Sequence, residues 1–397
     1  MSQTKAQLVS GTTAQNLTVD NINTSSINDA QTSGRKNIII NGAMAVAQRG
    51  TSFSSANITN SFPVDRFKLE QGNSQADVYT ITQNTNAARE LGFENSLKVV
   101  TATPDSSLAS GHFSQFRYNI EAQDFKRALY GTSNAKTLTL SFYVKSSQTG
   151  TFLVALNAPD GGRSNPQRYT INSANTWERK SITFAGDTES SAVYQTVAVN
   201  DRGFEVRFAL AIGSQFQGGT AGGGWVADSG YNNLYTTYTG NLQVSNASWE
   251  LTGVQLEVGS TATDFEHLTA VEDLSLCQRY TIAFDAKGSI DNFAPIGNGR
   301  FYNGTDAQIL VHLPTTMRNP PTIEAVSTTA ANTFFLNSDG GFGGHAMTSI
   351  ALNERSFNSI TFVAQSLGNI SGQTVGLGTT VYADDGDDAK LVLTAEF

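Results

Sequence analysis

Residues 249–280, WELTGVQLEVGSTATDFEHLTAVEDLSLCQRY, combine the signals of a strand, a turn and a helix in one stretch. The first ten residues alternate between apolar and polar side chains, as half-buried strands do. The apolar parity changes between Leu251 and Val254, and Gly253 lies at the change. A one-residue slip at a glycine predicts a β-bulge that keeps both halves of the strand turned toward the same core.

The second half of this stretch carries the start signal of a helix. Thr269 and Glu272 have the Thr-x-x-Glu spacing of a capping box, in which each side chain satisfies a backbone donor of the other residue. Leu274, Cys277 and Tyr280 follow at helical spacing. We therefore expect a short helix here, at a natural boundary between two domains.

Alternating apolar residues recur on both sides of this stretch and predict further strands. The alternating segments are 138–144, 152–156, 204–212, 307–313 and 389–397. A second helix is expected over 120–130 from the spacing of its apolar residues. Many strands joined by polar loops are typical of β-sandwiches of the jelly-roll or Greek-key kind. The expected fold is all-β: a jelly-roll β-sandwich followed by a second, smaller β-sandwich, with an extended N-terminal segment.

These patterns divide the chain into four parts. Residues 1–34 are polar and show no sustained periodicity. Two interpretations fit this pattern: a disordered tail, or an extended segment that becomes ordered against identical chains or a larger particle. The jelly roll is predicted over 35–268, the helix over 269–280, and the smaller β-sandwich over 281–397.

Composition narrows the possible functions. Charged residues make up 15% of the 397 residues, and the formal net charge of −9 argues against a protein that binds a nucleic-acid backbone. Cys277 is the single cysteine, so an intrachain disulfide is excluded. The sequence shows neither a signal peptide nor an apolar run long enough for a membrane span, so no membrane insertion is expected.

Several motifs, in order, resemble those of the phage tail-fibre and receptor-binding virion protein family. The likeness covers about residues 36–280, whereas 281–397 match only loosely. The motifs are NIIINGAM at 37–44, QRGTSF at 48–53, DRF at 65–67, TLTLSFYVK at 137–145, Trp177 with ITF at 182–184, LTGVQLEVGSTATDFE at 251–266 and LSLCQRY at 274–280.

This resemblance implies a bacteriophage virion protein with a carbohydrate-binding-module-like jelly roll and no transferable catalytic residues. The implied function is host attachment by non-catalytic binding to a surface glycan or receptor, and the fibre class implies a homotrimer. The N-terminal segment would attach to a tail or adaptor protein, and residues 281–397 would be distal and receptor-binding. The protein would be made in the host cytoplasm and located on the exterior of the phage tail. The alternatives are a capsid decoration or head fibre protein, a polysaccharide-degrading tail spike, and a free carbohydrate-binding module.

Aromatic residues in Gly-, Asn- and Thr-rich loops are the candidate ligand-binding residues. They are Trp225, Tyr231, Tyr235 and Tyr238, with Phe342 in a second, C-terminal loop. Exposed aromatic rings offer flat faces to sugar rings. In the alternative interpretation, Trp225 plugs one end of the sandwich, the tyrosines line a seam between subunits, and Phe342 belongs to a core.

The acidic run Asp384, Asp385, Asp387 and Asp388 is a candidate for Ca²⁺, because carboxylate oxygens are the ligands that this ion prefers. The run lacks the EF-hand spacing, and its central Asp-Gly step favours an ordinary hairpin turn. No histidine has a zinc-binding spacing, and Gly-x-Ser-x-Gly is absent. We therefore expect no catalytic residues, no resident metal and no cofactor.

Overall fold

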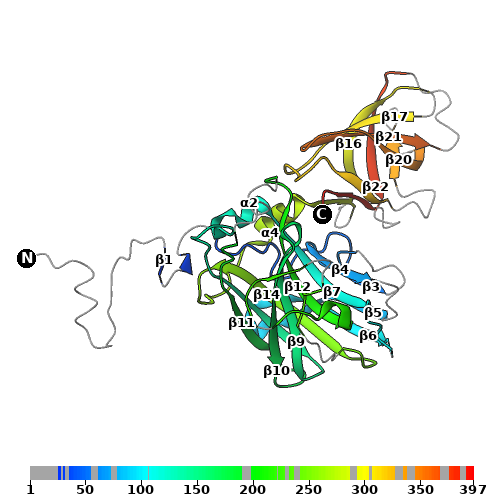
Figure 1. Ribbon diagram of the computed structural model, residues 1–397. Helices are drawn as coiled ribbons and strands as arrows, with labels where there is room; N and C mark the ends of the chain where they lie inside the picture. The colour runs from blue at the N-terminus through cyan, green and yellow to red at the C-terminus, as the bar shows by residue number, and fades with distance from the viewer. Residues whose placement is uncertain are drawn as a thin grey trace, which may run out of the picture.

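The all-β prediction is confirmed by a computed structural model, in which two β units follow each other along the chain (Figure 1). The structure describes residues 26–27, 30–31, 35–54, 61–72, 78–105, 107–189, 198–220, 222–228, 232–236, 242–286, 293–303, 306–326, 334–337, 345–366, 375–384 and 390–397.

The first unit is a jelly-roll sandwich of two six-stranded antiparallel sheets, and the chain crosses repeatedly between them. One sheet has the order β11 (Glu178–Phe184), β8 (Leu138–Ser146), β14 (Ser248–Val258), β6 (Phe93–Thr103), β5 (Val78–Ala88) and β3 (Ser52–Ser54). The other has the order β13 (Val226–Ala227), β10 (Arg163–Ile171), β9 (Gly150–Ala158), β12 (Arg202–Ile212), β7 (Phe113–Glu121) and β4 (Phe67–Gly72).

The second unit is also built from β-strands, but six of them close into a barrel where the alternating pattern predicted a sandwich. Alternation fixes which side chains point inward, and it does not determine whether a sheet closes on itself. The barrel order is β16 (Phe293–Phe301), β17 (Asp306–His312), β21 (Ser359–Ser366), β20 (His345–Arg355), β19 (Phe334–Asn337) and β22 (Gly378–Asp384). A three-stranded sheet adjoins it, with the order β15 (Thr281–Asp285), β23 (Lys390–Thr394) and β18 (Thr322–Val326).

Helices are short and lie at the edges of the sandwich. The capping box is confirmed: Thr269 caps α4 (Ala270–Gln278), and Thr269 and Glu272 exchange both hydrogen bonds. The helix expected over 120–130 is reduced to α2 (Ala122–Phe125) and one 3₁₀ turn, because β7 continues to Glu121. The remaining elements are the β1–β2 pair (Ser26–Ile27, Ala30–Gln31) and 3₁₀ turns at Arg89–Leu91, Pro159–Gly161 and Ser214–Phe216. No helix in the described ranges is long and apolar enough to cross a membrane.

Each unit has its own hydrophobic core. The core of the sandwich ends along the chain at Tyr280, and the core of the second unit begins at Ile282. In the sandwich, Phe116, Phe142, Phe208 and Trp249 lie between the two sheets with at most 1% of each side chain exposed. The side chains between these core residues therefore lie on the outer faces of the two sheets, where they can make other contacts.

The predicted bulge at Gly253 is confirmed. The pairing of β14 with β8 shifts between Thr252 and Gln255, and Gly253 adopts a φ of +60°. A Cβ at this position would lie 2.6 Å from the ring of Phe93 and 2.9 Å from the ring of Tyr143. Backbone conformation and close packing both require glycine here.

Replacing Gly253 with Ala is expected to lower the free energy of unfolding by roughly 1–3 kcal/mol, because strain and a steric clash act together. The matched control is Gly222→Ala, where φ is +73° and a Cβ would meet no atom within 4 Å. Urea denaturation of both variants gives the two losses of unfolding free energy. The loss for Gly222→Ala reflects backbone strain alone, and any further loss for Gly253→Ala reflects the steric clash. Equal losses in the two variants would show that packing around Gly253 contributes nothing.

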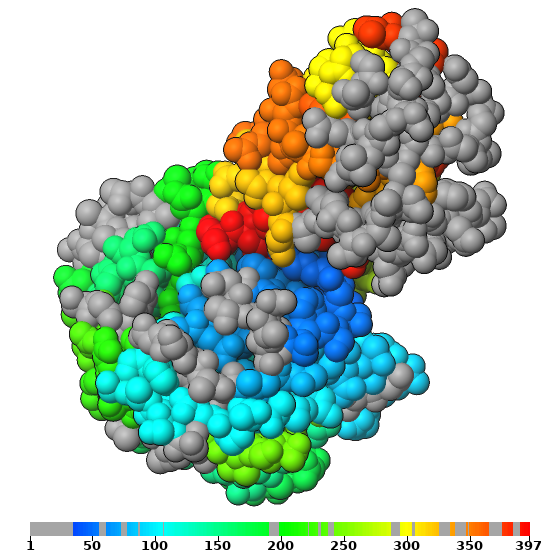
Figure 2. Space-filling view, turned by 90° about the vertical axis from the view of Figure 1, so that its right-hand side faces the viewer, coloured from blue at the N-terminus to red at the C-terminus, as the bar shows by residue number. Residues whose placement is uncertain are grey.

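A buried polar junction joins the two units. The guanidinium of Arg66, 1% exposed, is paired with the carboxylate of Glu396. The same guanidinium lies 3.4 Å above the ring of Tyr280 and donates to the carbonyl oxygen of Asn119 at 2.6 Å. Figure 2 shows the last residues of the chain, in red, against the first described part of the sandwich, in blue.

Arg318 makes a second connection at this junction. Its guanidinium donates to the carbonyl oxygens of Ala395 at 2.6 Å, Glu396 at 2.9 Å and Asn200 at 2.9 Å. It also lies 3.9 Å from the centre of the Phe397 ring. The barrel unit is thus held to the sandwich by charge, stacking and backbone hydrogen bonds together.

Candidate functional site

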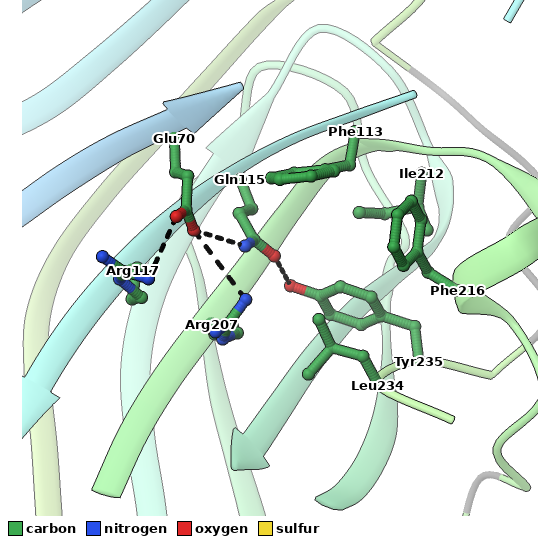
Figure 3. A pocket seen from close by; sticks show the side chains of 9 residues that line it. All are labelled: Glu70, Phe113, Gln115, Arg117, Arg207, Ile212, Phe216, Leu234 and Tyr235. Carbon is green, nitrogen blue, oxygen red and sulfur yellow. Dashed lines mark hydrogen bonds and ion pairs between the residues drawn. The ribbon is translucent and has the colours of Figure 1, made fainter. Parts of the chain in front are cut away.

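A cavity of about 150 Å³ lies on the outer face of the sheet that contains β4, β7 and β12, away from the main core. Residues 213–220 and 232–236 cover this part of the sheet, and they are tied together by the bond from the Tyr235 amide to the Phe216 carbonyl, 2.9 Å. The lining residues, drawn in Figure 3, are Glu70, Phe113, Gln115, Arg117, Arg207, Ile212, Phe216, Leu234 and Tyr235.

The polar side of the cavity is a connected chain of hydrogen bonds and ion pairs (Figure 3). Arg117 contacts one carboxylate oxygen of Glu70 at 3.0 Å, and Arg207 lies 3.8 Å from the other. The amide of Gln115 donates to Glu70 at 2.9 Å, and the hydroxyl of Tyr235 donates to Gln115 at 2.6 Å. The side chains are therefore held in fixed orientations around the space.

Strand alternation places these groups together. Glu70 is paired with Gln115 across β4 and β7, and Arg117 is paired with Arg207 across β7 and β12. Their neighbours Phe116 and Phe208 point the other way, into the main core. The polar side chains would face water on a bare sheet, and the covering residues turn that face into a partly open pocket.

The opposite side of the cavity is apolar. Phe113, Ile212, Phe216 and Leu234 gather there, and the rings of Phe113 and Phe216 meet edge to face with centres 5.3 Å apart. Ile212, Phe216 and Leu234 belong to a small separate hydrophobic cluster on this face. The cluster stabilises the covering segments against the sheet, so the cavity has one apolar wall and one charged wall.

Neighbouring charges keep Glu70 ionised. Burial alone would raise the pKa of Glu70, but the charges of Arg207 and Arg117 outweigh this effect and hold the pKa below its usual value. Burial raises the pKa of Tyr235, so its hydroxyl stays protonated and remains a donor. Glu205 lies behind Arg207, fully buried, and accepts from its Nε at 2.7 Å.

The dimensions of the cavity limit what it can hold. An engineered cavity of about 150 Å³ binds a six-membered benzene ring, so there is space here for one ring. A pyranose ring presents hydroxyl groups at its edge and C–H groups on its faces. The charged wall can exchange hydrogen bonds with such an edge, and the apolar wall can pack against such a face.

Of the aromatic residues predicted to bind a ligand, Tyr235 lies in this cavity, with its ring fully buried in the wall. Trp225 lies elsewhere: its indole nitrogen donates to the carbonyl oxygen of Ala185 at 2.8 Å. Its ring packs edge-on against Tyr130 at 5.5 Å and Phe204 at 5.8 Å. These contacts favour the interpretation of Trp225 as a plug at one end of the sandwich, not as a displayed binding surface.

For the other predicted site residues, the described part of the structure shows no binding site. Tyr231, Tyr238 and Phe342 lie outside the described residues. So do Asp385, Asp387 and Asp388 of the Ca²⁺ candidate, and Asp384 is described only as the last residue of β22. Within the described part of the chain, no three His, Cys, Asp or Glu side chains are arranged to hold a metal ion.

Sequence reasoning missed Glu70, Gln115, Arg117 and Arg207. The signal was the alternation of Phe67–Gly72, FKLEQG, of Phe113–Glu121, FSQFRYNIE, and of Arg202–Ile212, RGFEVRFALAI, which places polar residues between core residues. That alternation could have shown that these side chains share one face. It could not have shown that residues 213–220 and 232–236 cover them.

No protein-family model matches the chain, and no curated protein matches it. Among solved structures, the active domain of tailspike protein 4 of bacteriophage CBA120 is similar, with a TM-score of 0.30 and 13% identity. That match covers 56% of this chain and 21% of the tailspike domain, so the chain spans about a fifth of that relative.

Two carbohydrate-binding modules are also similar to the sandwich. A family 11 module of a Clostridium thermocellum cellulosomal cellulase gives a TM-score of 0.25 at 13% identity, covering 53% of this chain and 96% of the module. A module solved with β-1,4-galactotriose, TmCBM61, gives 0.28 at 7% identity, covering 56% of this chain and 99% of the module. These likenesses concern the β-sandwich and say nothing of individual residues.

Proposed function

We propose that this chain binds a carbohydrate, without cleaving it, through the cavity on β4, β7 and β12. The observation that carries the proposal is the division of the cavity between a hydrogen-bonded polar wall, with Glu70, Gln115 and Tyr235, and an aromatic wall, with Phe113 and Phe216. A concave site with a few fixed polar groups opposite an apolar surface is the usual form of a small-ligand site.

The same geometry favours binding over hydrolysis. Glycoside hydrolysis requires two carboxyl groups beside the scissile bond, one of them protonated to act as the general acid. Among the lining residues Glu70 is the single carboxylate, and its pKa is held below the usual value. Glu205 is buried behind Arg207 and does not line the space.

The proposal extends to a phage virion protein, a tail fibre or receptor-binding protein that attaches to a host surface glycan. Its support is the ordered series of motifs over residues 36–280, together with a surface low in charge. Several copies in a homotrimer, and several trimers on a particle, would multiply weak single-site affinities into strong attachment.

The test of carbohydrate binding pairs two half-buried phenylalanines. Phe113→Ala removes part of the cavity wall, whereas Phe53→Ala removes a similar ring from β3 in the opposite sheet. On an array of bacterial surface glycans we expect retention of the wild-type protein and of Phe53→Ala. Phe113→Ala should lose about tenfold in affinity, equivalent to roughly 1.4 kcal/mol.

Equal losses in the two variants, or no retained glycan at all, would contradict the proposed site. Incubation of the protein with a retained polysaccharide should release no new reducing ends, and their release would identify a depolymerase. Cryo-electron microscopy of the particle would test the virion assignment: density at the tail supports a fibre, and density on the head supports the capsid decoration alternative.

A further inference from the structure

Three cations stand side by side on the outer face of the sheet at the cavity. Lys68 on β4 is paired directly with Arg117 on β7, and Arg117 is paired directly with Arg207 on β12. Like charges at directly opposite positions of neighbouring strands destabilise a sheet. Such a row therefore requires compensating negative charge close by.

The carboxylates at this row are shared between several cations. Within ion-pair distance of one another, three arginines, Arg117, Arg202 and Arg207, share the two carboxylates of Glu70 and Glu205. Lys68 interacts with Glu70 and Glu396 at longer range, and Arg207 interacts with Asp228. Arg117 and Arg207 are therefore both paired with the same two carboxylates.

Most of this charge is removed from water. The side chain of Arg207 is 4% exposed and that of Arg117 is 9% exposed, and both line the cavity. The Nε atom of Arg117 is buried and has no acceptor among the described residues. A buried donor without an acceptor costs free energy, which an anion placed in the cavity would recover.

Lys68 lies at the edge of the row. Burial lowers the pKa of Lys68 most, the positive charge of Arg117 lowers it further, and Glu70 and Glu396 offset part of this effect. An additional negative charge beside Lys68 and Arg117 would therefore be favourable. The carboxylate of Glu70 does not remove this preference, because it already serves both Arg117 and Arg207.

We propose that the cavity binds a single sugar ring that carries an anionic substituent, either a carboxylate or a phosphate; this rests on the proposed function of the site in carbohydrate binding. The anion lies against Arg117 and Arg207, and the ring lies between these groups and the wall of Phe113 and Phe216. The volume matches one ring, so we expect a single sugar residue of the glycan to occupy the cavity.

Calorimetric titration of the full chain tests this with four probes: glucuronate, glucose 6-phosphate, glucose and inorganic phosphate. We expect both anionic sugars to bind at least about tenfold more tightly than glucose, equivalent to about 1.4 kcal/mol. Inorganic phosphate should bind more weakly than glucose 6-phosphate, because it makes no contact with the apolar wall. Raising the ionic strength should weaken the anionic sugars and leave glucose unchanged.

Two substitutions should act in opposite directions, which a merely structural role would not produce. Lys68→Gln removes a positive charge beside the cavity and should weaken glucuronate binding about three- to tenfold. Glu70→Gln removes a negative charge of similar shape and should tighten it. Lys98→Gln, which removes the same charge from β6 in the opposite sheet, is the control and should change nothing. Melting temperatures confirm that each variant is folded.

The outcomes separate the two proposals. Binding of glucose as tightly as glucuronate, or weakening by Glu70→Gln, overturns the anionic substituent while carbohydrate binding stands. Binding of phosphate as tightly as glucose 6-phosphate overturns the sugar ring, because the site would then be one for free anions. Failure of every sugar here and of every glycan on the array overturns the proposed function as well.

Discussion

Glu396→Gln is expected to lower the free energy of unfolding by roughly 3–5 kcal/mol, the usual cost of removing one partner of a buried ion pair. The substitution keeps the shape of the side chain but removes the carboxylate that is paired with the guanidinium of Arg66. That guanidinium is 1% exposed, and Tyr280 covers it, so water cannot replace the lost carboxylate. Urea denaturation monitored by intrinsic fluorescence measures the loss.

The matched control is Glu324→Gln at the rim of the same junction. Glu324 accepts from the Nε of Arg49 at 2.7 Å, but it is 32% exposed, so solvent replaces much of its interaction. We expect a loss of about 1 kcal/mol or less. The double variant Arg66→Met/Glu396→Leu should be more stable than Glu396→Gln, because neither charge remains buried. A loss under about 1 kcal/mol for Glu396→Gln would refute a dry, charge-dependent junction.

Trp249→Ala should destabilise the sandwich by roughly 3–5 kcal/mol, as expected when a large aromatic side chain is removed from a core. Trp249 is fully buried, stacks on Phe116 with centres 6.1 Å apart, and contacts Phe208 at 6.1 Å. Its indole nitrogen also donates to the hydroxyl of Tyr169 at 3.2 Å, and the substitution removes this hydrogen bond.

Alanine variants of the two other tryptophans serve as comparisons for this loss of unfolding free energy. Trp177 is half-buried beside Lys145, whose Nζ lies 4.8 Å from its ring, so Trp177→Ala should cost about 1 kcal/mol or less. Trp225→Ala should fall between the two, because its ring packs against Tyr130 and Phe204 at the edge of the core. A Trp225 loss as small as that of Trp177 would favour the displayed-ring prediction.

Local patterns in the sequence predicted the strands at 138–144, 152–156, 204–212 and 249–258 and the facing of their side chains. The bulge at Gly253 and the cap at Thr269 were predicted because each depends on residues within a few positions of each other. Periodicity failed at 120–130, where pairing with β12 extends β7 to Glu121 and overrides the helical spacing. Tertiary contacts routinely override such local preferences.

The site depends on contacts that no local pattern encodes. Tyr235 reaches Gln115 across 120 residues of sequence, and Arg66 reaches Glu396 across 330. Composition marked residues 222–238 as a loop with aromatic rings, but it gave no reason to place Trp225 against the core and Tyr235 in a cavity. Only the arrangement of the strands, with their covering segments, brings these side chains together.

The junction around Arg66 and Arg318 also determines how the molecule responds to force. Units joined by a flexible linker swing independently, whereas here bending between them must separate a buried ion pair and the hydrogen bond from Arg318 to the carbonyl oxygen of Asn200. A force applied to the barrel is therefore transmitted through this junction to the sandwich, and the two units move together. Load would reach the cavity-bearing sheet directly, because Arg66 immediately precedes β4, whose Glu70 lines the cavity.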